Sequence, residues 1–304
     1  MLRDRVRTSA FRDAIAAVVH PGDTVLDVGA GSGILSLFAA QRGARVFAVE
    51  SSAMSYLAQK LTVANGYSDR IRVLPGDIEH IPLAERVDVI VSEWLGTFGI
   101  DENFLRPVLV ARDRYLKPGG RMIPAVVSAW LAPVSIAWID RDLDYWRSRP
   151  YDLDLELIAQ STCHEMLWCR ERLTAEHQLA DPQLLWETDA HAFSLERASL
   201  PFRASVTFHA SRSGRATALT AWFSACLAPG VGLTNALSAP ETHWGQYVFP
   251  LDPPPDLSPG DTLMAEFTSI PASPGYCYHA WSVRHNSARW SHHDTRVVPW
   301  LGQR

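Results

Sequence analysis

The chain has 304 residues and carries 28 lysines and arginines against 33 aspartates and glutamates, which gives a formal net charge of −5 with neutral histidines. This length is sufficient for two domains with buried cores, and 47% hydrophobic with 20% charged residues excludes an intrinsically disordered chain. The acidic balance argues against a protein that binds nucleic acid through its phosphates, because such proteins present a basic face.

Strand and helix patterns alternate through the first 120 residues. Apolar runs at 24–28, 45–49, 71–74 and 87–91 predict buried strands. A helix pattern follows the first run up to Gly43, and a second begins after a capping Ser52, with Met54, Leu57, Ala58 and Leu61 on one apolar face. A third spans 105–116 and is expected to end at 117–120. This alternation predicts an α/β fold with a doubly wound, mostly parallel sheet, the Rossmann-like arrangement.

Period-two strand patterns dominate after residue 123, at 204–211, 216–227, 247–251, 262–270 and 276–283. They predict a second, antiparallel β domain, with a hairpin turn at 211–214. Residues 122–139 carry no charge, but their prolines, serines and β-branched residues favour buried strands over a membrane span. A charged, helix-like stretch covers about 140–185. We therefore divide the chain into domains at 1–123 and 124–304.

A glycine loop follows the first predicted strand, with the spacing Asp27-x-Gly29-x-Gly31-x-Gly33. A dinucleotide site would need G-x-G-x-x-G, but residue 34 is isoleucine. The loop instead suits a ligand with a ribose and an amino-acid tail and no pyrophosphate, which is S-adenosylmethionine. Glu50 ends the second strand, where it can accept hydrogen bonds from ribose hydroxyls. The alternative is a glycine-rich structural turn.

A second motif, SEWLGTFGIDE at 92–102, follows the fourth predicted strand and therefore lies beside the same crevice. Glu93 and Glu102 converge on one cation if the loop doubles back, and carboxylates match a planar guanidinium in a bidentate way. The other interpretation leaves both glutamates solvated, or places Glu102 at a helix N-terminus, where negative charge is favourable anyway.

The remaining polar residues give weaker signals. His243 stands beside Trp244, a pair that on its own is usually packed or on the surface. The 4 cysteines form no CxxC pair, and no histidine has metal-ligand spacing, so no metal site is expected. The N-terminus lacks the apolar segment of a signal peptide, so we expect a cytoplasmic protein with no membrane partner. Only Lys60 and Lys117 are lysines, an arginine bias that favours a bacterial source.

Together these motifs resemble the protein arginine methyltransferase family in its type I-like branch. The resemblance covers nearly the whole chain: MLRDRVRT at 1–8, VLDVGAGSGILSLFAA at 25–40, the SEW…E loop, ARDRYLKPGG at 111–120, MIP at 122–124 and the THW loop. It implies a Rossmann-like methyltransferase domain followed by a β-barrel with a helical dimerisation arm, from about Tyr145 to Leu184. It also implies a homodimer. The cofactor would be S-adenosylmethionine, and its product S-adenosylhomocysteine.

The resemblance assigns roles to individual residues. Arg7 would hold the cofactor carboxylate, Asp27 and Gly29 its methionine portion, Glu50 its ribose and Glu79 its adenine, with further cofactor contacts from Gly31, Gly33, Ser51, Ile78 and Glu93. Glu93 and Glu102 would hold the substrate guanidinium, and His243 would pair with Asp4. Met1 and Phe104 would crowd the target nitrogen, in a substrate pocket completed by Trp94, Asp101 and Trp244.

Three departures bear on the substrate. The family has a further N-terminal helix with tyrosines that close over the cofactor, so that lid is missing or precedes residue 1. Thr97 and Asp101 replace residues that are commonly aromatic, and Asp101 is a candidate for the α-amino group of a free amino acid. The acceptor is therefore protein arginine, free arginine or a small guanidino metabolite of a biosynthetic pathway. The alternatives are an inactive scaffold or a methyltransferase of another small nucleophile.

The acidic residues are unevenly distributed along the chain. The segment 85–104 holds five acids and one base, a net charge of −4 in a chain whose total is −5. This excess predicts an acidic mouth for a cationic substrate, formed by Glu85, Asp88, Glu93, Asp101 and Glu102.

Overall fold

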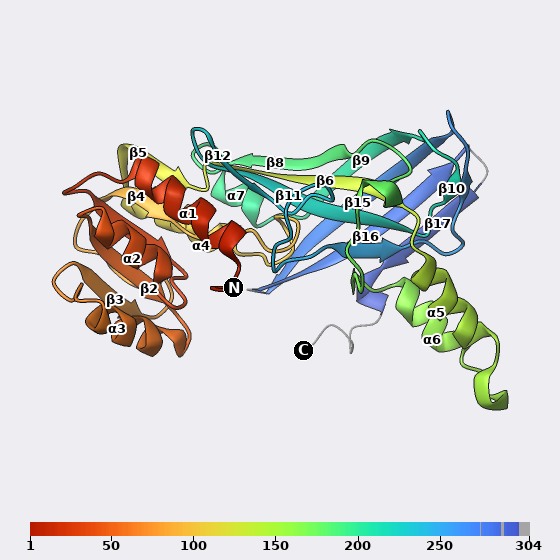
Figure 1. Ribbon diagram of the computed structural model, residues 1–304, viewed down its shortest axis with the longest axis horizontal. Helices are drawn as coiled ribbons and strands as arrows, with labels where there is room; N and C mark the ends of the chain where they lie inside the picture. Colours follow the sequence, from red (N-terminus) through yellow and green to blue (C-terminus); the bar gives the residue numbers. More distant parts are fainter. Residues whose placement is uncertain (274, 287–288, 298–304) are drawn as a thin grey trace.

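The structure is a computed structural model that describes residues 1–273, 275–286 and 289–297. Its first part is a five-stranded parallel sheet in the order β3-β2-β1-β4-β5, drawn from red to yellow in Figure 1. The elements of this part are α1 (Arg5–Val18), β1 (Thr24–Val28), α2 (Ile34–Gln41), β2 (Arg45–Glu50), α3 (Met54–Ala64), β3 (Ile71–Pro75), β4 (Val87–Val91), α4 (Leu105–Tyr115) and β5 (Leu116–Ile123).

The strand order reverses between β1 and β4, so a crevice opens at their carboxyl ends. All five residues of β1 are buried, which matches its continuous apolar run. The predicted end of the third helix at 117–120 agrees with the structure to within two residues, since α4 ends at Tyr115 and β5 follows directly. Residues 117–120 lie within β5, where the pairing with β4 is irregular because the chain bulges between Leu116 and Arg121.

The second part is antiparallel. One sheet has the order β7-β13-β11-β6-β8 with β12 paired to β11, another has the order β17-β16-β15-β9, and β10 pairs with β14. Its strands are β6 (Val126–Val134), β7 (Leu167–Trp168), β8 (Gln183–Asp189), β9 (Phe202–His209), β10 (Gly214–Arg215), β11 (Ala218–Ala228), β12 (Val231–Thr234), β13 (Tyr247–Pro250), β14 (Asp256–Leu257), β15 (Thr262–Ser273), β16 (Tyr276–His285) and β17 (Arg289–Asp294). The predicted fold class, a parallel α/β sheet followed by a barrel-like antiparallel domain, is confirmed.

The helical segment α5 (Ala137–Arg147) and α6 (Glu156–Cys163) projects from the far end of this domain, as Figure 1 shows. The short helix α7 (Leu195–Ala198) lies between β8 and β9, and single 3-10 turns occur at Pro150–Asp152, Ala175–His177 and Thr295–Val297. No helix in the described ranges is long and apolar enough to cross a membrane.

One sequence prediction fails against these elements. The turn at 211–214 does not close a hairpin, because β9 pairs with β15 while the next strand, β10, pairs with β14. The turn instead carries the chain from one sheet to another. The expected apolar face of α3 is largely uncovered: Met54 and Leu57 are each 41% exposed, and only Ala58 and Thr62 are buried.

The helix α1 joins the two parts of the molecule. It packs against α2 on one side and against β11 and β12 of the antiparallel domain on the other. The loop 92–102 makes a second connection, because the ring of Phe98 packs edge-on against Phe249 at 5.7 Å and Phe267 at 6.1 Å in the core of the antiparallel domain. The loop starts in the parallel-sheet domain, and burial of this aromatic ring anchors it in the antiparallel domain.

Candidate functional site

The glycine loop begins directly after β1. Gly29 adopts a φ of 71°, and a Cβ placed on it would lie 2.9 Å from a ring carbon of Phe104. Glycine is therefore required at this position both by its left-handed backbone and by the close approach of that ring. The backbone N–H of Gly29 donates to the carbonyl of Val49 at 2.9 Å, which holds the loop against the end of β2.

Glu50 ends β2 and holds the loop from the other side. Its carboxylate accepts hydrogen bonds from the backbone N–H of Gly31 and of Ser52, each at 2.8 Å. Burial alone would raise the pKa of Glu50, but the hydrogen bonds from Ser52 and Gly31 outweigh it and lower the pKa below its usual range. The group is thus an ionised acceptor, and each oxygen retains a lone pair for a further donor such as a hydroxyl.

Asp27 is fully buried at the end of β1. The hydroxyl of Ser36 donates to Oδ2 at 2.6 Å, while Oδ1 has no partner within the described ranges. Burial raises the pKa of Asp27 to about 6, and the bond from Ser36 offsets only part of that rise. A buried acceptor without a donor is costly, so its place at the crevice suggests a donor supplied by a ligand.

Glu93 stands at the start of the loop 92–102 and forms an ion pair with Arg7 of α1. Its Oε2 accepts from Nη2 of Arg7 at 2.9 Å and from Nε at 3.2 Å, and its Oε1 accepts from the N–H of Leu95 at 3.0 Å. Arg7 is 4% exposed, and its guanidinium lies over the rings of Phe11 and Trp244. Both charges are therefore fixed in orientation.

Glu102 stands at the other end of the same loop and is exposed. Within the part of the chain that the structure describes, no hydrogen bond or ion pair reaches its carboxylate. Partial burial by the surrounding protein, together with the negative charges of Asp101 and Glu93, raises the pKa of Glu102 to about 7, although part of the residue remains exposed to solvent. The site thus offers an unpaired carboxylate that gains most from a cation.

Asp101 does not face the crevice, which corrects the expectation that it could bind an α-amino group. Its two oxygens accept the N–H of Thr97 at 3.1 and 2.9 Å, and Oδ1 also accepts that of Phe98 at 3.1 Å. Burial raises the pKa of Asp101 to about 6 against the effect of these bonds. Asp101 closes the turn of the loop and is a structural residue.

Asn235 is a functional candidate that the sequence analysis missed. Its amide Nδ2 donates to the carbonyls of Thr97 at 2.8 Å and Gly245 at 2.9 Å, and its Oδ1 accepts the N–H of Phe223 at 2.9 Å. One buried side chain thereby ties the loop 92–102 to the loop of His243 and Trp244. The only sequence feature that could have pointed to Asn235 is its position as a polar residue directly after an apolar strand.

His243 and Asp4 lie together, 239 positions apart in the chain. Asp4 caps α1 by accepting the N–H of Arg7 at 2.9 Å, and its Oδ2 accepts from the N–H and from Nδ1 of His243 at 2.9 and 2.8 Å. Burial would raise the pKa of Asp4, but these bonds lower it. The pair attaches the start of α1 to the antiparallel domain.

Other predicted residues occupy different surroundings. Met1 is 65% exposed and Ser51 is exposed, whereas Ile78, Trp94 and Trp244 are buried. Glu79 forms an ion pair with Arg106 at 3.0 Å, within a chain segment that follows β3. The structure thus brings together Arg7, Asp27, Glu50 and Glu93 around the crevice, and leaves the Met1 side chain largely exposed.

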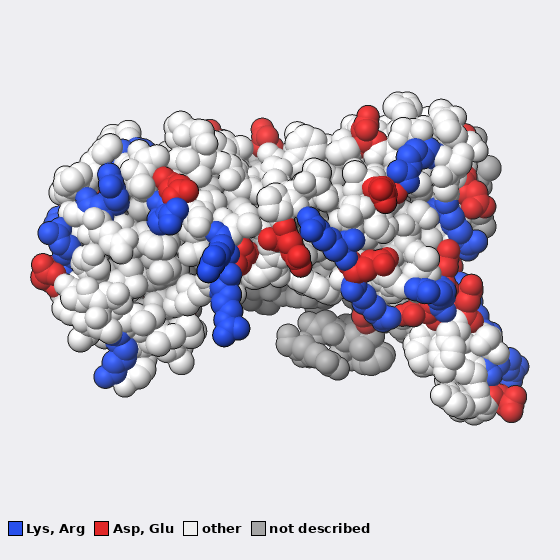
Figure 2. Space-filling model, in the orientation of Figure 1, with Lys and Arg blue, Asp and Glu red and all other residues white. Residues whose placement is uncertain are grey.

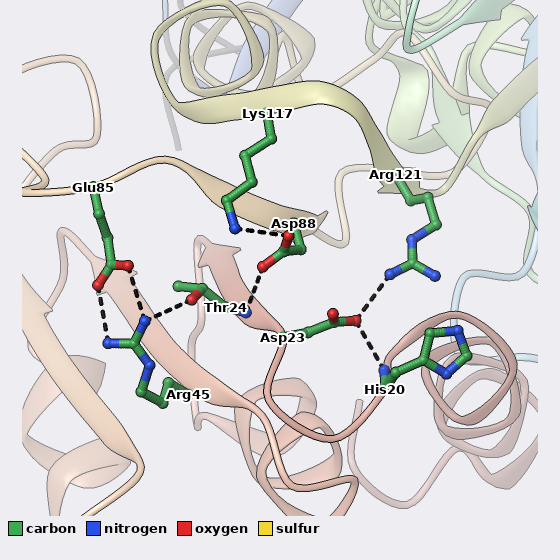
Figure 3. Close-up of polar contacts among 8 residues, drawn as sticks. All are labelled: His20, Asp23, Thr24, Arg45, Glu85, Asp88, Lys117 and Arg121. Carbon is green, nitrogen blue, oxygen red and sulfur yellow. Dashed lines mark hydrogen bonds and ion pairs between the residues drawn. The ribbon is translucent and has the colours of Figure 1, made fainter.

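The acidic excess of 85–104 is not gathered at a mouth. Figure 3 shows Glu85 paired with Arg45 at 2.9 Å and Asp88 paired with Lys117 at 2.7 Å. Asp88 also accepts from the N–H of Thr24 at 2.9 Å. These residues lie at the amino ends of β1, β2 and β4, opposite the crevice, and on the face in Figure 2 acidic and basic side chains are interspersed. Sequence clustering was misleading because a strand separates Asp88 from Glu93.

Two family models match the chain. One is described as a methyltransferase domain and matches residues 25–120, and the other is described as an arginine methyltransferase oligomerization subdomain and matches residues 127–275. Among curated proteins, the chain is 34% identical to protein arginine N-methyltransferase PRMT10 of Oryza sativa subsp. japonica, covering 89% of this chain and 79% of that one. It is also 34% identical to protein arginine N-methyltransferase 6 of Danio rerio, covering 90% and 81%.

Solved structures give the same result. The PRMT1 enzyme-prozyme heterotetrameric complex of Trypanosoma brucei with AdoHcy has a TM-score of 0.88 at 28% identity, covering 97% of this chain and 95% of that one. Protein arginine methyltransferase 10 of Arabidopsis thaliana, in a structure described as uniquely open, has a TM-score of 0.83 at 29% identity, covering 97% and 96%. Both similarities extend over the parallel sheet and the antiparallel domain.

Proposed function

This chain belongs to the protein arginine N-methyltransferase family and is an S-adenosylmethionine-dependent arginine N-methyltransferase, and we propose that its acceptor is an arginine side chain of a protein. The observation that carries the proposal is the loop 92–102. Its two glutamates stand beside the glycine loop, one fixed by Arg7 and one without a partner among the described residues. A cation placed between them would satisfy Glu102 and leave Glu93 in place.

The residues of the crevice fit the cofactor. Arg7 would hold its carboxylate, the unpaired Oδ1 of Asp27 would accept from its amino group, and the free lone pairs of Glu50 would accept from its ribose hydroxyls. We propose Gly29, Gly31, Gly33, Ser51, Ile78 and Glu79 as the other cofactor residues. When bound, S-adenosylmethionine supplies an electrophilic methyl group on its sulfonium and leaves as S-adenosylhomocysteine.

The two glutamates would prepare the nucleophile. A guanidinium is protonated at neutral pH, so its nitrogens are poor nucleophiles, and it carries five N–H donors in a plane. Two carboxylates localise the positive charge on the nitrogens that they contact, which leaves the third nitrogen with more lone-pair character. Because Arg7 and the loop bonds already fix Glu93, little reorganisation is needed on binding, and most of the acceleration comes from positioning and electrostatics.

The methylated nitrogen must lose a proton when its new C–N bond forms. His243 is the proposed acceptor: its Nδ1–H is directed at Asp4, which leaves Nε2 unprotonated in the neutral ring. Asp4 therefore sets the tautomer, as an orienting carboxylate does for a catalytic histidine. Trp94, Asp101, Phe104, Trp244 and Met1 stay proposed only as neighbours of the substrate pocket, with Asp101 in the structural role given above.

Protein arginine is favoured over free arginine on two grounds. The similar curated proteins are named protein arginine N-methyltransferases. Asp101 was the one residue that suggested an amino-acid substrate, and its carboxylate oxygens instead accept hydrogen bonds from backbone N–H groups.

The test offers labelled S-adenosylmethionine to an arginine–glycine peptide, free arginine and agmatine in parallel, with products identified by mass. We expect label in the peptide and at least tenfold less in the two small molecules. Glu176→Gln, an exposed surface change, serves as the matched control for Glu93→Gln. Label only in free arginine or agmatine would contradict the protein acceptor, and label in none would exclude a guanidino substrate and favour an inactive scaffold.

We also propose the division of the chain into two domains at 1–123 and 124–304. A second proposal is that the chain forms a homodimer through its arm. The arm exposes Tyr151 at 81%, Leu157 at 74% and Leu153 at 57%, and α3 exposes Tyr56 at 69% and Val63 at 57%. The two surfaces lie at opposite ends of the molecule in Figure 1, so a two-fold pair buries each against the other and closes a ring. Light scattering should show a dimer that Leu157→Asp dissociates.

A further inference from the structure

A cavity of about 310 Å³ lies behind the loop 92–102, between the two parts of the molecule. One wall comes from the loop and from the start of α4, another from the segment between β8 and β9, and the floor from Ser269 and Cys277 of β15 and β16. None of the carboxylates of the proposed active site lines it within the described chain. The cavity is therefore separate from those carboxylates, and it shares Trp94 and Phe104 with the residues proposed above as neighbours of the substrate pocket.

Five aromatic side chains line this interdomain cavity: Trp94, Phe104, Trp186, Phe193 and Phe202. Trp186 packs edge-on against Phe193 at 5.9 Å and Phe202 at 6.4 Å. A concave space of this size that combines aromatic side chains with polar and charged groups is typical of a small-molecule site.

The charged groups at the cavity are of one sign. Arg197 and Arg203 line it, no aspartate or glutamate does, and neither arginine has an ion-pair partner among the described residues. The guanidinium of Arg197 lies 5.3 Å from the centre of the Phe193 ring, so it is held at the wall. The first turn of α4 begins here at Leu105, without a capping side chain and without an acidic residue. Its free N–H groups add to the positive potential.

We propose that the interdomain cavity binds a small aromatic carboxylate, with the ring between the aromatic walls and the carboxylate at Arg197 and Arg203. The aromatic side chains fit a single ring system, and two arginines that are exposed and have no ion-pair partner among the described residues fit one anionic group. A neutral aromatic compound would leave both guanidinium groups to solvent, and a hydrophilic anion would leave the rings without contacts.

A ligand in the cavity would contact residues that adjoin the proposed reaction centre. Phe104 lines the cavity and also lies against Gly29 of the glycine loop. Trp94 follows Glu93 directly, and Asn103 follows Glu102. A bound ring therefore touches a neighbour of each glutamate, without touching the glutamates themselves.

The experiment measures binding alone, so its outcome is independent of methyl transfer. Phenylacetate, hydrocinnamate and indole-3-acetate are titrated calorimetrically into the full chain, with phenylacetamide as the neutral match for phenylacetate. We expect at least one carboxylate to bind, and the amide to bind about tenfold more weakly because it lacks the charge-assisted hydrogen bonds. Arg197→Gln and Arg203→Gln should each weaken the carboxylate about tenfold, whereas Arg141→Gln, an exposed arginine on α5, should leave it unchanged.

Four results would overturn the proposal. Equal affinity for the acid and its amide would remove the arginines as anchors, and unchanged binding by both arginine variants would place the ligand elsewhere. Competition by S-adenosylhomocysteine would place the carboxylate on Arg7 in the crevice. If none of the three acids binds at millimolar concentration, the cavity is not a site for this class of ligand.

Discussion

The loop 92–102 holds its two ends in different ways. At the first end, the side chain of Glu93 is 9% exposed, paired with Arg7 and bonded to the N–H of Leu95. At the other end, Glu102 is exposed and lacks a partner among the described residues, and its pKa is raised to about 7. The loop between them is fixed by Asp101, Phe98 and Asn235.

This difference separates two functions within one pair of glutamates. Glu93 has its orientation before any substrate arrives, because the cost of fixing it is met by folding. Glu102 lacks a counter-ion, and a guanidinium would supply one. The arrangement makes the first end responsible for geometry and the second for recognition of charge, and each prediction below tests one end against the other.

The largest effect is expected from Glu93→Gln. The substitution keeps the shape and an acceptor for Arg7 but removes the negative charge, so methyl transfer should fall by about 10³ or more, or about 4 kcal/mol. Calorimetry with S-adenosylhomocysteine should show that cofactor binding survives, and Glu176→Gln should behave as the unaltered protein. Loss of cofactor binding together with activity would count against the assigned role of Glu93.

Asp101→Ala should destabilise the fold by about 3 kcal/mol, since two buried backbone N–H groups lose their acceptor. Asp101→Asn retains one acceptor oxygen and should cost about half as much. Urea denaturation measures both variants. If Asp101→Ala instead left stability unchanged and weakened only the binding of free arginine, Asp101 would face the substrate, and the middle of the loop would belong to recognition.

The sequence was sufficient for features that depend on neighbours in the chain. The strand–loop–helix order around Gly29, and the acid at the end of β2, follow from residues within a few positions of one another. The pairing of Glu93 with Glu102 across nine positions also followed from the motif. Sequence could not reveal that Asp101 turns inward, because a carboxylate that caps a loop and one that binds a cation have the same local pattern.

Long-range contacts account for the other failures. The bond from Asn235 to Thr97 spans 138 positions, and no local pattern encodes it. The exposure of the apolar face of α3 could not be foreseen, because apolar periodicity does not distinguish a face that packs in the core from one that lies on the surface. The acidic excess was misplaced because Asp88 and Glu93 are close in sequence but lie at opposite ends of β4.

The pH dependence of methyl transfer should also distinguish the two ends of the loop 92–102. Guanidinium binding needs ionised Glu102, so kcat/KM for the peptide should rise about a hundredfold between pH 5 and pH 8 and level off above a pKa of about 7. A pH-independent rate over this range would mean that Glu102 is already ionised by pH 5.

The same pKa affects stability with the opposite sign. The folded pKa of Glu102, about 7, lies above the unfolded value of about 4.3, so the folded state holds the proton more tightly. Its contribution to stability is fully present below pH 4.3 and is lost as the pH rises through 7. Glu102→Gln should therefore be relatively more stable at pH 8 than at pH 4, measured as the difference from the unaltered protein by denaturation at each pH.

The smallest effect is expected from Asn235→Ala, which tests how firmly the loop 92–102 is tied to the loop of His243. The substitution removes two donors and one acceptor, and water that enters the gap can replace part of them, so we expect a loss of about 2 kcal/mol of stability. Because Thr97 would be released between the glutamates, KM for the peptide should rise severalfold while the affinity for S-adenosylhomocysteine stays constant. Gln246→Ala is the control, since Gln246 bonds to the carbonyl of Asn235 and has no hydrogen bond to the loop 92–102 among those described. An equal rise in KM for both variants would show that general loosening, and not the bond to Thr97, sets the spacing of the two glutamates.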